Sequence, residues 1–111
     1  MQLIDIKDYI EEILEHSPDM IVITDIKGVI LSFNKGAEDM LGYKKEAVLQ
    51  KNIEDLWERK YDRRKLIEIV KKEGHVSNFE ALLKTKDGND LHINLTMSPL
   101  KDASGKIIGT L

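Results

Sequence analysis

The chain has 111 residues, 41% hydrophobic and 33% charged, with two prolines. That length suits one compact domain, and the composition is typical of a soluble globular protein and excludes a disordered or fibrous chain. The formal net charge of −3 comes from 20 acidic and 17 basic residues interspersed along the sequence, which argues against nucleic acid or an anionic membrane as a partner.

The sequence contains no cysteine, which excludes disulfides, thiolate metal sites and thiol nucleophiles and is compatible with a reducing compartment. No apolar stretch approaches the roughly 20 residues that a bilayer-spanning helix needs. The amino terminus carries acids where a signal peptide would carry bases. We therefore expect a cytoplasmic domain with no direct membrane contact.

The first segment predicts an amphipathic helix. Between residues 3 and 15, apolar side chains recur at helical spacing and charged side chains fall mostly between them. Ser17-Pro18 ends the pattern, because proline disfavours helical geometry in the residue before it. Residues 1–16 are thus expected to form a flanking helix, and residues 17–111 a core domain. The apolar stripe consists of Leu3, Ile6, Ile10, Ile13 and Leu14.

Two β-rich runs follow, at residues 20–24 and 29–33, around a turn signal that ends in Gly28. They predict a hairpin. From Gly36 to Gly74 the pattern changes to short helices, and Gly42 and Gly74 are expected helix stops. The last of these helices is the longest. Its basic residues are expected to form a solvated face, namely Arg63, Arg64, Lys65, Lys71 and Lys72.

Strand patterns return at residues 76–85, 91–97 and 106–111. In the first two, alternate positions are apolar, so each strand has one apolar face. The order is helix, two strands, several short helices and three strands. This order predicts an α+β fold with a single five-stranded antiparallel sheet and helices gathered on one face.

Short motifs in this order resemble the PAS family across nearly the whole chain. They include the segment from His16 to Met20, Ile23-Thr24-Asp25 with Gly28, and the stretch from Asn34 to Tyr43. Further along come the segment from Lys84 to Gly88, Ser98-Pro99, and Asp102 with Gly105 and Gly109. Each piece alone is a weak turn or cap signal, but together, at these spacings, they are specific.

The resemblance implies a five-stranded sheet whose concave face and helices enclose a pocket. A filled hydrophobic core explains most of the pocket-side residues equally well, because cores need close-packed apolar side chains whether or not a ligand exists. Thr24 is the one obvious polar anchor. The pocket side carried over from the family comprises Val22, Thr24, Met40, Leu41, Ile53, Trp57, Leu66, Val70, Phe79, Ala81, Leu83, Ile93, Leu95 and Met97.

We expect no cofactor and no metal. Flavin photosensors of this family need a cysteine for their light-driven adduct, and the chain has none. Haem-binding members often take a histidine from the long helix before the third strand; here the nearest is His75, just beyond that helix. His92 alternates with apolar neighbours and should face away from the pocket.

No catalytic function is expected. The sequence lacks the G-x-x-x-x-G-K-[ST], G-x-G-x-x-G, G-x-S-x-G and H-E-x-x-H motifs. Adjacent acids such as Glu11-Glu12 point in different directions on a helix and form no acid/base pair. We therefore predict that the chain has no catalytic residues.

The resemblance implies a sensory and regulatory module of a larger signalling protein, since the family usually continues beyond the last strand into a linker and coiled coil. We expect signal relay to a linked output domain, such as the histidine kinase of a two-component system, and a homodimer. The alternative is a sensor that binds a small apolar molecule or haem in the pocket. The expected dimer contacts lie on the first helix and the outer sheet face, at Leu3, Ile6, Ile10, Ile13, Ile21 and Ile23.

Overall fold

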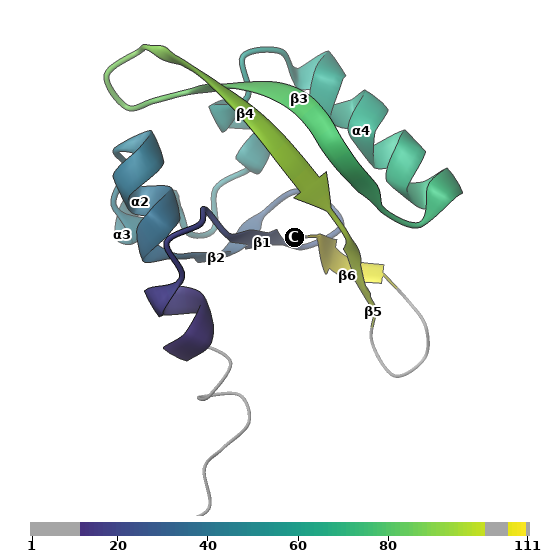
Figure 1. Cartoon of the computed structure of the whole chain (residues 1–111), viewed down its shortest axis with the longest axis horizontal. Helices are drawn as coiled ribbons and strands as arrows, with labels where there is room; N and C mark the ends of the chain where they lie inside the picture. The colour runs from purple at the N-terminus through teal and green to yellow at the C-terminus, as the bar shows by residue number, and fades with distance from the viewer. Residues whose placement is uncertain (1–11, 102–106, 111) are drawn as a thin grey trace, which may run out of the picture.

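The computed structural model describes residues 12–101 and 107–110 of the chain. Its elements follow the predicted order of helix, two strands and several helices, but four strands rather than the expected three come after the last helix (Figure 1). Residues 12–16 are helical. They are followed by β1 (Val22–Thr24), β2 (Ile30–Phe33), α2 (Lys35–Leu41), α3 (Lys45–Val48), the 3-10 helix η1 (Ile53–Leu56), α4 (Lys60–Glu73), β3 (Val76–Lys84), β4 (Asp90–Met97), β5 (Pro99–Lys101) and β6 (Ile107–Thr110).

The strands form two antiparallel sheets, one with the order β2-β1-β6-β5 and one of β3 and β4. The predicted single five-stranded sheet is therefore not confirmed. Only Ser98 separates β4 from β5, so the chain passes directly from one sheet to the other, as Figure 1 shows. Pro99 follows that residue, and a proline has no N–H to continue the β4 ladder.

Of the predicted amino-terminal helix, the structure describes residues 12–16, which are helical up to His16, immediately before Ser17-Pro18. Most of the predicted apolar stripe, including Leu3, Ile6 and Ile10, lies outside the described residues. Within the described part, Ile13 is 53% exposed and Leu14 is half-buried.

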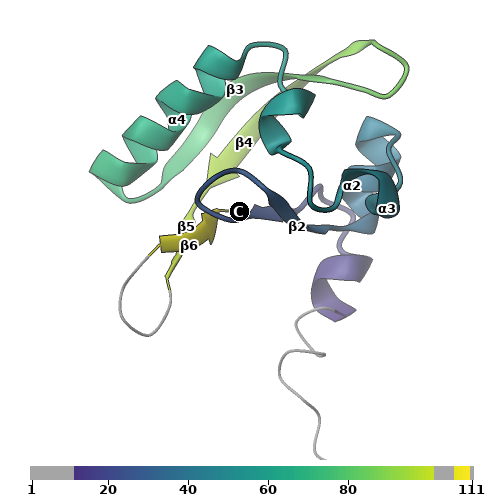
Figure 2. The same cartoon turned by 180° about the vertical axis from the view of Figure 1, so that it is seen from behind.

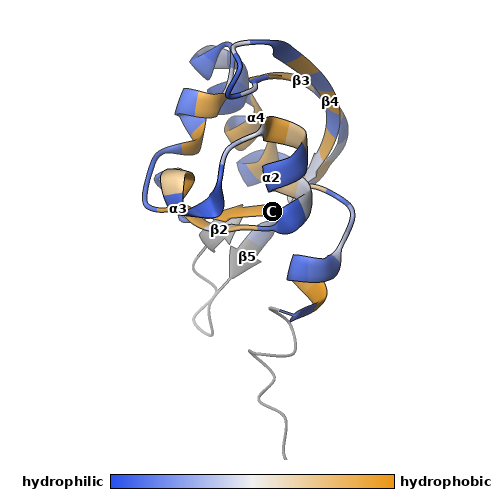
Figure 3. Ribbon diagram, turned by 90° about the vertical axis from the view of Figure 1, so that its left-hand side faces the viewer, coloured by the Kyte–Doolittle hydropathy of each residue, from blue (hydrophilic) through white to orange (hydrophobic). Residues whose placement is uncertain are grey.

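The core lies between the strands and the helices. Viewed from behind, α4 runs along the β3–β4 ribbon, while α2 and α3 lie beside β2 (Figure 2). Figure 3 shows apolar and polar bands alternating along the helices, so each helix turns one side inward. The largest fully buried apolar side chains are Phe33, Ile30, Leu41 and Leu66.

Both predicted helix stops are confirmed. Gly42 follows α2 with φ of 82°, and its N–H donates to the Glu38 carbonyl at 2.8 Å. Gly74 follows α4 with φ of 96°, and its N–H donates to the Val70 carbonyl at 2.9 Å. Glycine adopts these positive φ values without the steric cost that a Cβ would add.

Helix α2 packs very closely on the segment before β1. A Cβ at Gly36 would lie 2.7 Å from the carbonyl carbon of Asp19 and 2.9 Å from the carbonyl oxygen of Pro18. Both are backbone atoms, which cannot swing aside as a flexible side chain can. Only a glycine therefore permits this approach.

Asn34 connects three separate parts of the chain. It is 2% exposed, and its Oδ1 accepts hydrogen bonds from the N–H groups of Ile21 (2.8 Å) and Ala37 (3.0 Å). Its Nδ2 donates to the carbonyls of Leu14 (2.9 Å) and Asp19 (2.8 Å). The side chain thus caps α2 and also fixes the amino-terminal helix and the entry to β1.

We predict that Asn34→Ala lowers the free energy of unfolding by about 2–4 kcal/mol, because it removes the cap and leaves buried backbone groups unpaired. Asn34→Asp separates the two roles: it keeps the accepting oxygen but loses the donor to Leu14 and Asp19. Urea unfolding followed by circular dichroism measures both variants, with the exposed Asn94→Asp as control. Wild-type stability of Asn34→Asp would show that the donor side contributes nothing.

Candidate ligand-binding cavity

An apolar cavity of about 100 Å³ lies between the strands and the helices. It is lined by side chains from β1, β3 and β4 and from α2, η1 and α4, together with flanking residues. The lining residues are Met20, Val22, Thr24, Leu41, Ile53, Trp57, Arg63, Leu83, Ile93, Leu95, Thr96 and Met97. Trp57, the only tryptophan in the chain, is 4% exposed there.

Most of the predicted pocket residues line this cavity. They are Val22, Thr24, Leu41, Ile53, Trp57, Leu83, Ile93, Leu95 and Met97. Leu66, Val70 and Ala81 are instead buried in the core away from it, and Phe79 packs against that core with its ring centroid 6.5 Å from that of Trp57.

Met40 departs from the prediction. It is 43% exposed and lines a separate groove of about 600 Å³, bounded by residues 18–22 and by β4 and Ser98. Met40 precedes the fully buried Leu41 by one residue, and successive helical residues point in directions about 100° apart. The groove and the cavity share several lining residues of β1 and β4, so they adjoin each other.

Sequence reasoning missed three lining residues, of which Arg63 matters most. We expected Arg63 on a solvated face, but it is 4% exposed and lines the cavity. Arg63 lies three residues before Leu66 and seven before Val70, so helical spacing places it on their buried face. The spacing could have revealed this position, but the charge of the residue argued against it.

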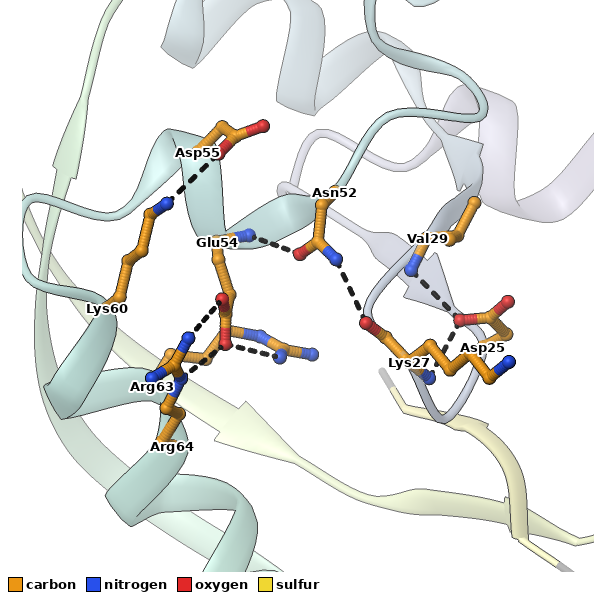
Figure 4. Close-up of polar contacts among 9 residues, drawn as sticks. All are labelled: Asp25, Lys27, Val29, Asn52, Glu54, Asp55, Lys60, Arg63 and Arg64. Carbon is orange, nitrogen blue, oxygen red and sulfur yellow. Dashed lines mark hydrogen bonds and ion pairs between the residues drawn. The ribbon is translucent and has the colours of Figure 1, made fainter.

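Glu54 stands between two guanidinium groups (Figure 4). Arg64 Nε donates to Glu54 Oε1 at 3.1 Å, and Arg64 Nη2 donates to Oε2 at 3.3 Å. Arg63 Nη1 is 3.9 Å from Oε1, too far for a hydrogen bond. The hydrogen bond from Arg64 lowers the pKa of Glu54, with further lowering from the charges of Arg64, Arg63 and Lys60, while burial opposes the shift.

Arg63 is held in an environment that disfavours its charge. Burial lowers the pKa of the guanidinium, and the negative charges of Glu54 and Asp25 counteract this only in part. Its Nε is buried and has no hydrogen-bond partner among the described residues. A buried donor of this kind is rare in folded proteins and calls for a specific explanation.

Polar contacts hold the Asp25–Gly28 turn and η1 together beside Arg63. Asn52 Oδ1 accepts from Glu54 N at 2.9 Å, and Asn52 Nδ2 donates to the Lys27 carbonyl at 3.0 Å (Figure 4). A Cβ at Gly28 would lie 2.8 Å from Asn52 Oδ1 and 3.2 Å from Arg63 Nη1. The absence of a side chain at Gly28 therefore makes room for Asn52 and Arg63.

The histidines do not reach the cavity. His75 is exposed and is not among the lining residues, so its position gives no support to the haem alternative. His92 is exposed on β4 and points away from the cavity, as predicted. Within residues 12–101 and 107–110, no three or more His, Cys, Asp or Glu residues are grouped to hold a metal ion. In the same residues, no helix combines the length and apolarity that a membrane crossing requires.

The lowered pKa of Glu54 predicts a stability that depends on pH. The folded carboxylate binds protons more weakly than the unfolded one, so its contribution is complete above the ordinary pKa of 4.5 and is lost as the pH falls through the folded value. Glu54→Gln should lower the free energy of unfolding by about 1–3 kcal/mol at neutral pH and by much less near about pH 3. Urea titrations at both pH values test this, with the exposed Glu46→Gln as control; an equal loss at both would contradict it.

Comparison with solved structures gives a consistent result. The PAS domain of a protein from Colwellia psychrerythraea has a TM-score of 0.86 and 26% identity, and the match covers 96% of this chain and 92% of that one. An RNA-binding Light-Oxygen-Voltage receptor has a TM-score of 0.81 at 16% identity, over 99% of this chain and 33% of that chain. A PAS domain from a two-component sensor histidine kinase has a TM-score of 0.78 at 13% identity, over 94% and 91%.

A search for similar sequences among curated proteins finds no significant match. The family model described as the PAS fold matches residues 8–111, which is most of the sequence. The fold, the cavity and the motifs agree with that match. The chain therefore belongs to the PAS family.

Proposed function

We propose that this chain is the sensory and regulatory PAS module of a larger signalling protein and has no catalytic activity of its own. In this proposal, it relays the state of its cavity to a linked output domain such as the histidine kinase of a two-component system. A ligand or partner that binds one arrangement of the module more tightly shifts its population toward that arrangement. The cytoplasmic location and the division at residues 16 and 17 stay predictions.

The observation that carries this proposal is that the cavity is lined by β4, the strand that leads into β5 and so to its partner β6. Trp57 lines the cavity and also forms a backbone bridge to Leu83 of β3, and Glu58 N donates to the Leu82 carbonyl at 2.9 Å. β4 lines the cavity and leads through Ser98 into β5, which pairs with β6. A change in the cavity can therefore reach β6 through directly connected backbone.

A chimera tests the relay, with this chain in place of the PAS domain of a sensor histidine kinase. Val22→Phe would fill part of the cavity, so we expect it to change the rate of kinase autophosphorylation by about 5-fold or more. Leu31→Phe, at an exposed position of β2, is the matched control and should leave the rate unchanged. If the Val22→Phe chimera folds and has the wild-type rate, the relay through the cavity is wrong.

We also propose a homodimer through the amino-terminal helix and the outer face of β1. Ile13 is 53% exposed on that helix, and Ile21 and Ile23 are only half-buried. Symmetric dimers are the commonest soluble oligomers, and an exposed apolar side chain at their interface becomes buried.

Ile13→Asp should convert a dimeric chain to a monomer, because the carboxylate would be desolvated in the interface. Light scattering coupled to size-exclusion chromatography measures the mass. Ile26→Asp, at a 56% exposed position in the turn after β1, serves as control and should stay dimeric. An unchanged dimer for Ile13→Asp would place the contact elsewhere.

The second candidate is a sensor for a small ligand, and the cavity with its buried Arg63 favours it. Ligand pockets are mainly apolar with a few polar groups that fix orientation, which matches this lining. The haem version of this candidate has less support, because His75 lies outside the cavity lining.

A further inference from the structure

We propose that the cavity binds a small apolar monocarboxylate whose carboxylate accepts a hydrogen bond from Arg63 Nε. This inference deepens the proposed sensory function and rests on it for its biological meaning. The ligand would place its apolar body among the side chains of Trp57, Leu83 and Met97, and its one charged group against the guanidinium.

The first step is the missing partner of Arg63. The side chain of Arg63, taken alone, is 5% exposed. Its Nε donates to no acceptor in the described part of the chain. Arg63 also lines the cavity, so a molecule held there has access to this residue. An acceptor oxygen on such a molecule would satisfy the buried donor.

The second step concerns the neighbouring carboxylates, which are engaged elsewhere. Arg64 holds both oxygens of Glu54 in hydrogen bonds, and Lys60 pairs with Asp55 at 3.7 Å. Asp25 Oδ1 accepts from the N–H groups of Lys27 and Val29, each at 2.9 Å. Among the described residues, Arg63 is thus left with one ion pair, the 3.9 Å contact of Nη1 with Glu54.

The third step is the chemical class of the acceptor. The planar guanidinium has a rigid fork of donors that matches the two oxygens of a carboxylate, and such charge-assisted hydrogen bonds are stronger than neutral ones. Nη1 lies 3.9 Å from Glu54 Oε1, and Nε is the buried donor of the guanidinium that lacks a partner in the described part of the chain. A carboxylate would also neutralise a charge that is otherwise buried in apolar surroundings.

The size of the cavity limits the rest of the ligand. Its volume is about 100 Å³, somewhat smaller than the roughly 150 Å³ cavity that holds benzene. The remaining lining is almost entirely apolar, so the body of the ligand should carry no further polar group. Butyrate meets these conditions and is the probe for the test.

The test titrates the purified chain with butyrate and with butyramide, its neutral analogue of the same shape. Fluorescence of Trp57, the only tryptophan, reports occupancy of the cavity. A proton–nitrogen correlation spectrum follows the Nε–H signal of Arg63, assigned by its absence in Arg63→Met. We expect butyrate to saturate both signals and butyramide to bind at least about tenfold more weakly.

Two variants complete the experiment. Arg63→Met keeps the length of the side chain without its donors and should lose the preference for butyrate. Arg59→Met removes an exposed guanidinium that does not line the cavity, and should keep that preference. If Arg63→Met does not fold, Arg63→Lys, which also lacks the Nε–H group, assigns the signal, and the response of that signal in the wild-type chain decides the question.

Three outcomes would overturn the proposal: no binding of butyrate, equal binding of butyrate and butyramide, or saturation without a shift of the Arg63 Nε–H signal. Equal binding would leave the cavity as a site for neutral ligands, and the proposed sensory function would stand. That function fails separately, when the Val22→Phe chimera behaves as wild type although butyrate binds.

Discussion

The buried amide of Asn34 is the interaction on which the arrangement of this domain depends. It satisfies backbone groups from the amino-terminal helix, the entry to β1 and the start of α2 at the same time. Since these segments carry Met20 and Val22 on one wall of the cavity and Leu41 on another, their relative position shapes the cavity. The close contact at Gly36 holds α2 against the same segment. Buried polar networks of this kind specify a unique packing because a shifted arrangement leaves groups unpaired.

Arg63 places a charge where the remaining lining is apolar. Replacing a buried ion pair with apolar residues is often neutral or stabilising, so the contact of Arg63 with Glu54 alone is weak evidence that the charge serves stability. Glu54 forms its hydrogen bonds with Arg64, which is on the surface. This arrangement connects the electrostatics of η1 and α4 to the cavity and gives the module a polar anchor that Thr24 alone would not supply.

Local patterns were sufficient for much of the fold. The alternation of apolar residues in β3 and β4 correctly separated Ala81, Leu83 and Met97 from the exposed His92. Gly42 and Gly74 marked helix ends because positive φ is a property of a single residue and its neighbours. Strand pairing is different, because it depends on segments far apart in the chain. The separate strand β5 that begins at Pro99, and the pairing of β6 with both β1 and β5, could not be predicted from local patterns.

By itself, the sequence determined the order of most elements, because hydrophobic spacing and turn residues act over short distances. The family and the expected pocket residues followed from the resemblance of its motifs to PAS domains. Only the tertiary structure decided which residues of that lining surround a cavity and which fill the core, as Leu66 and Val70 do. It also placed Arg63 inside and Met40 at the surface, against the expectation from charge and hydrophobicity. The reason is physical: whether a side chain is buried depends on what packs against its side of the helix, and that packing comes from residues distant in sequence.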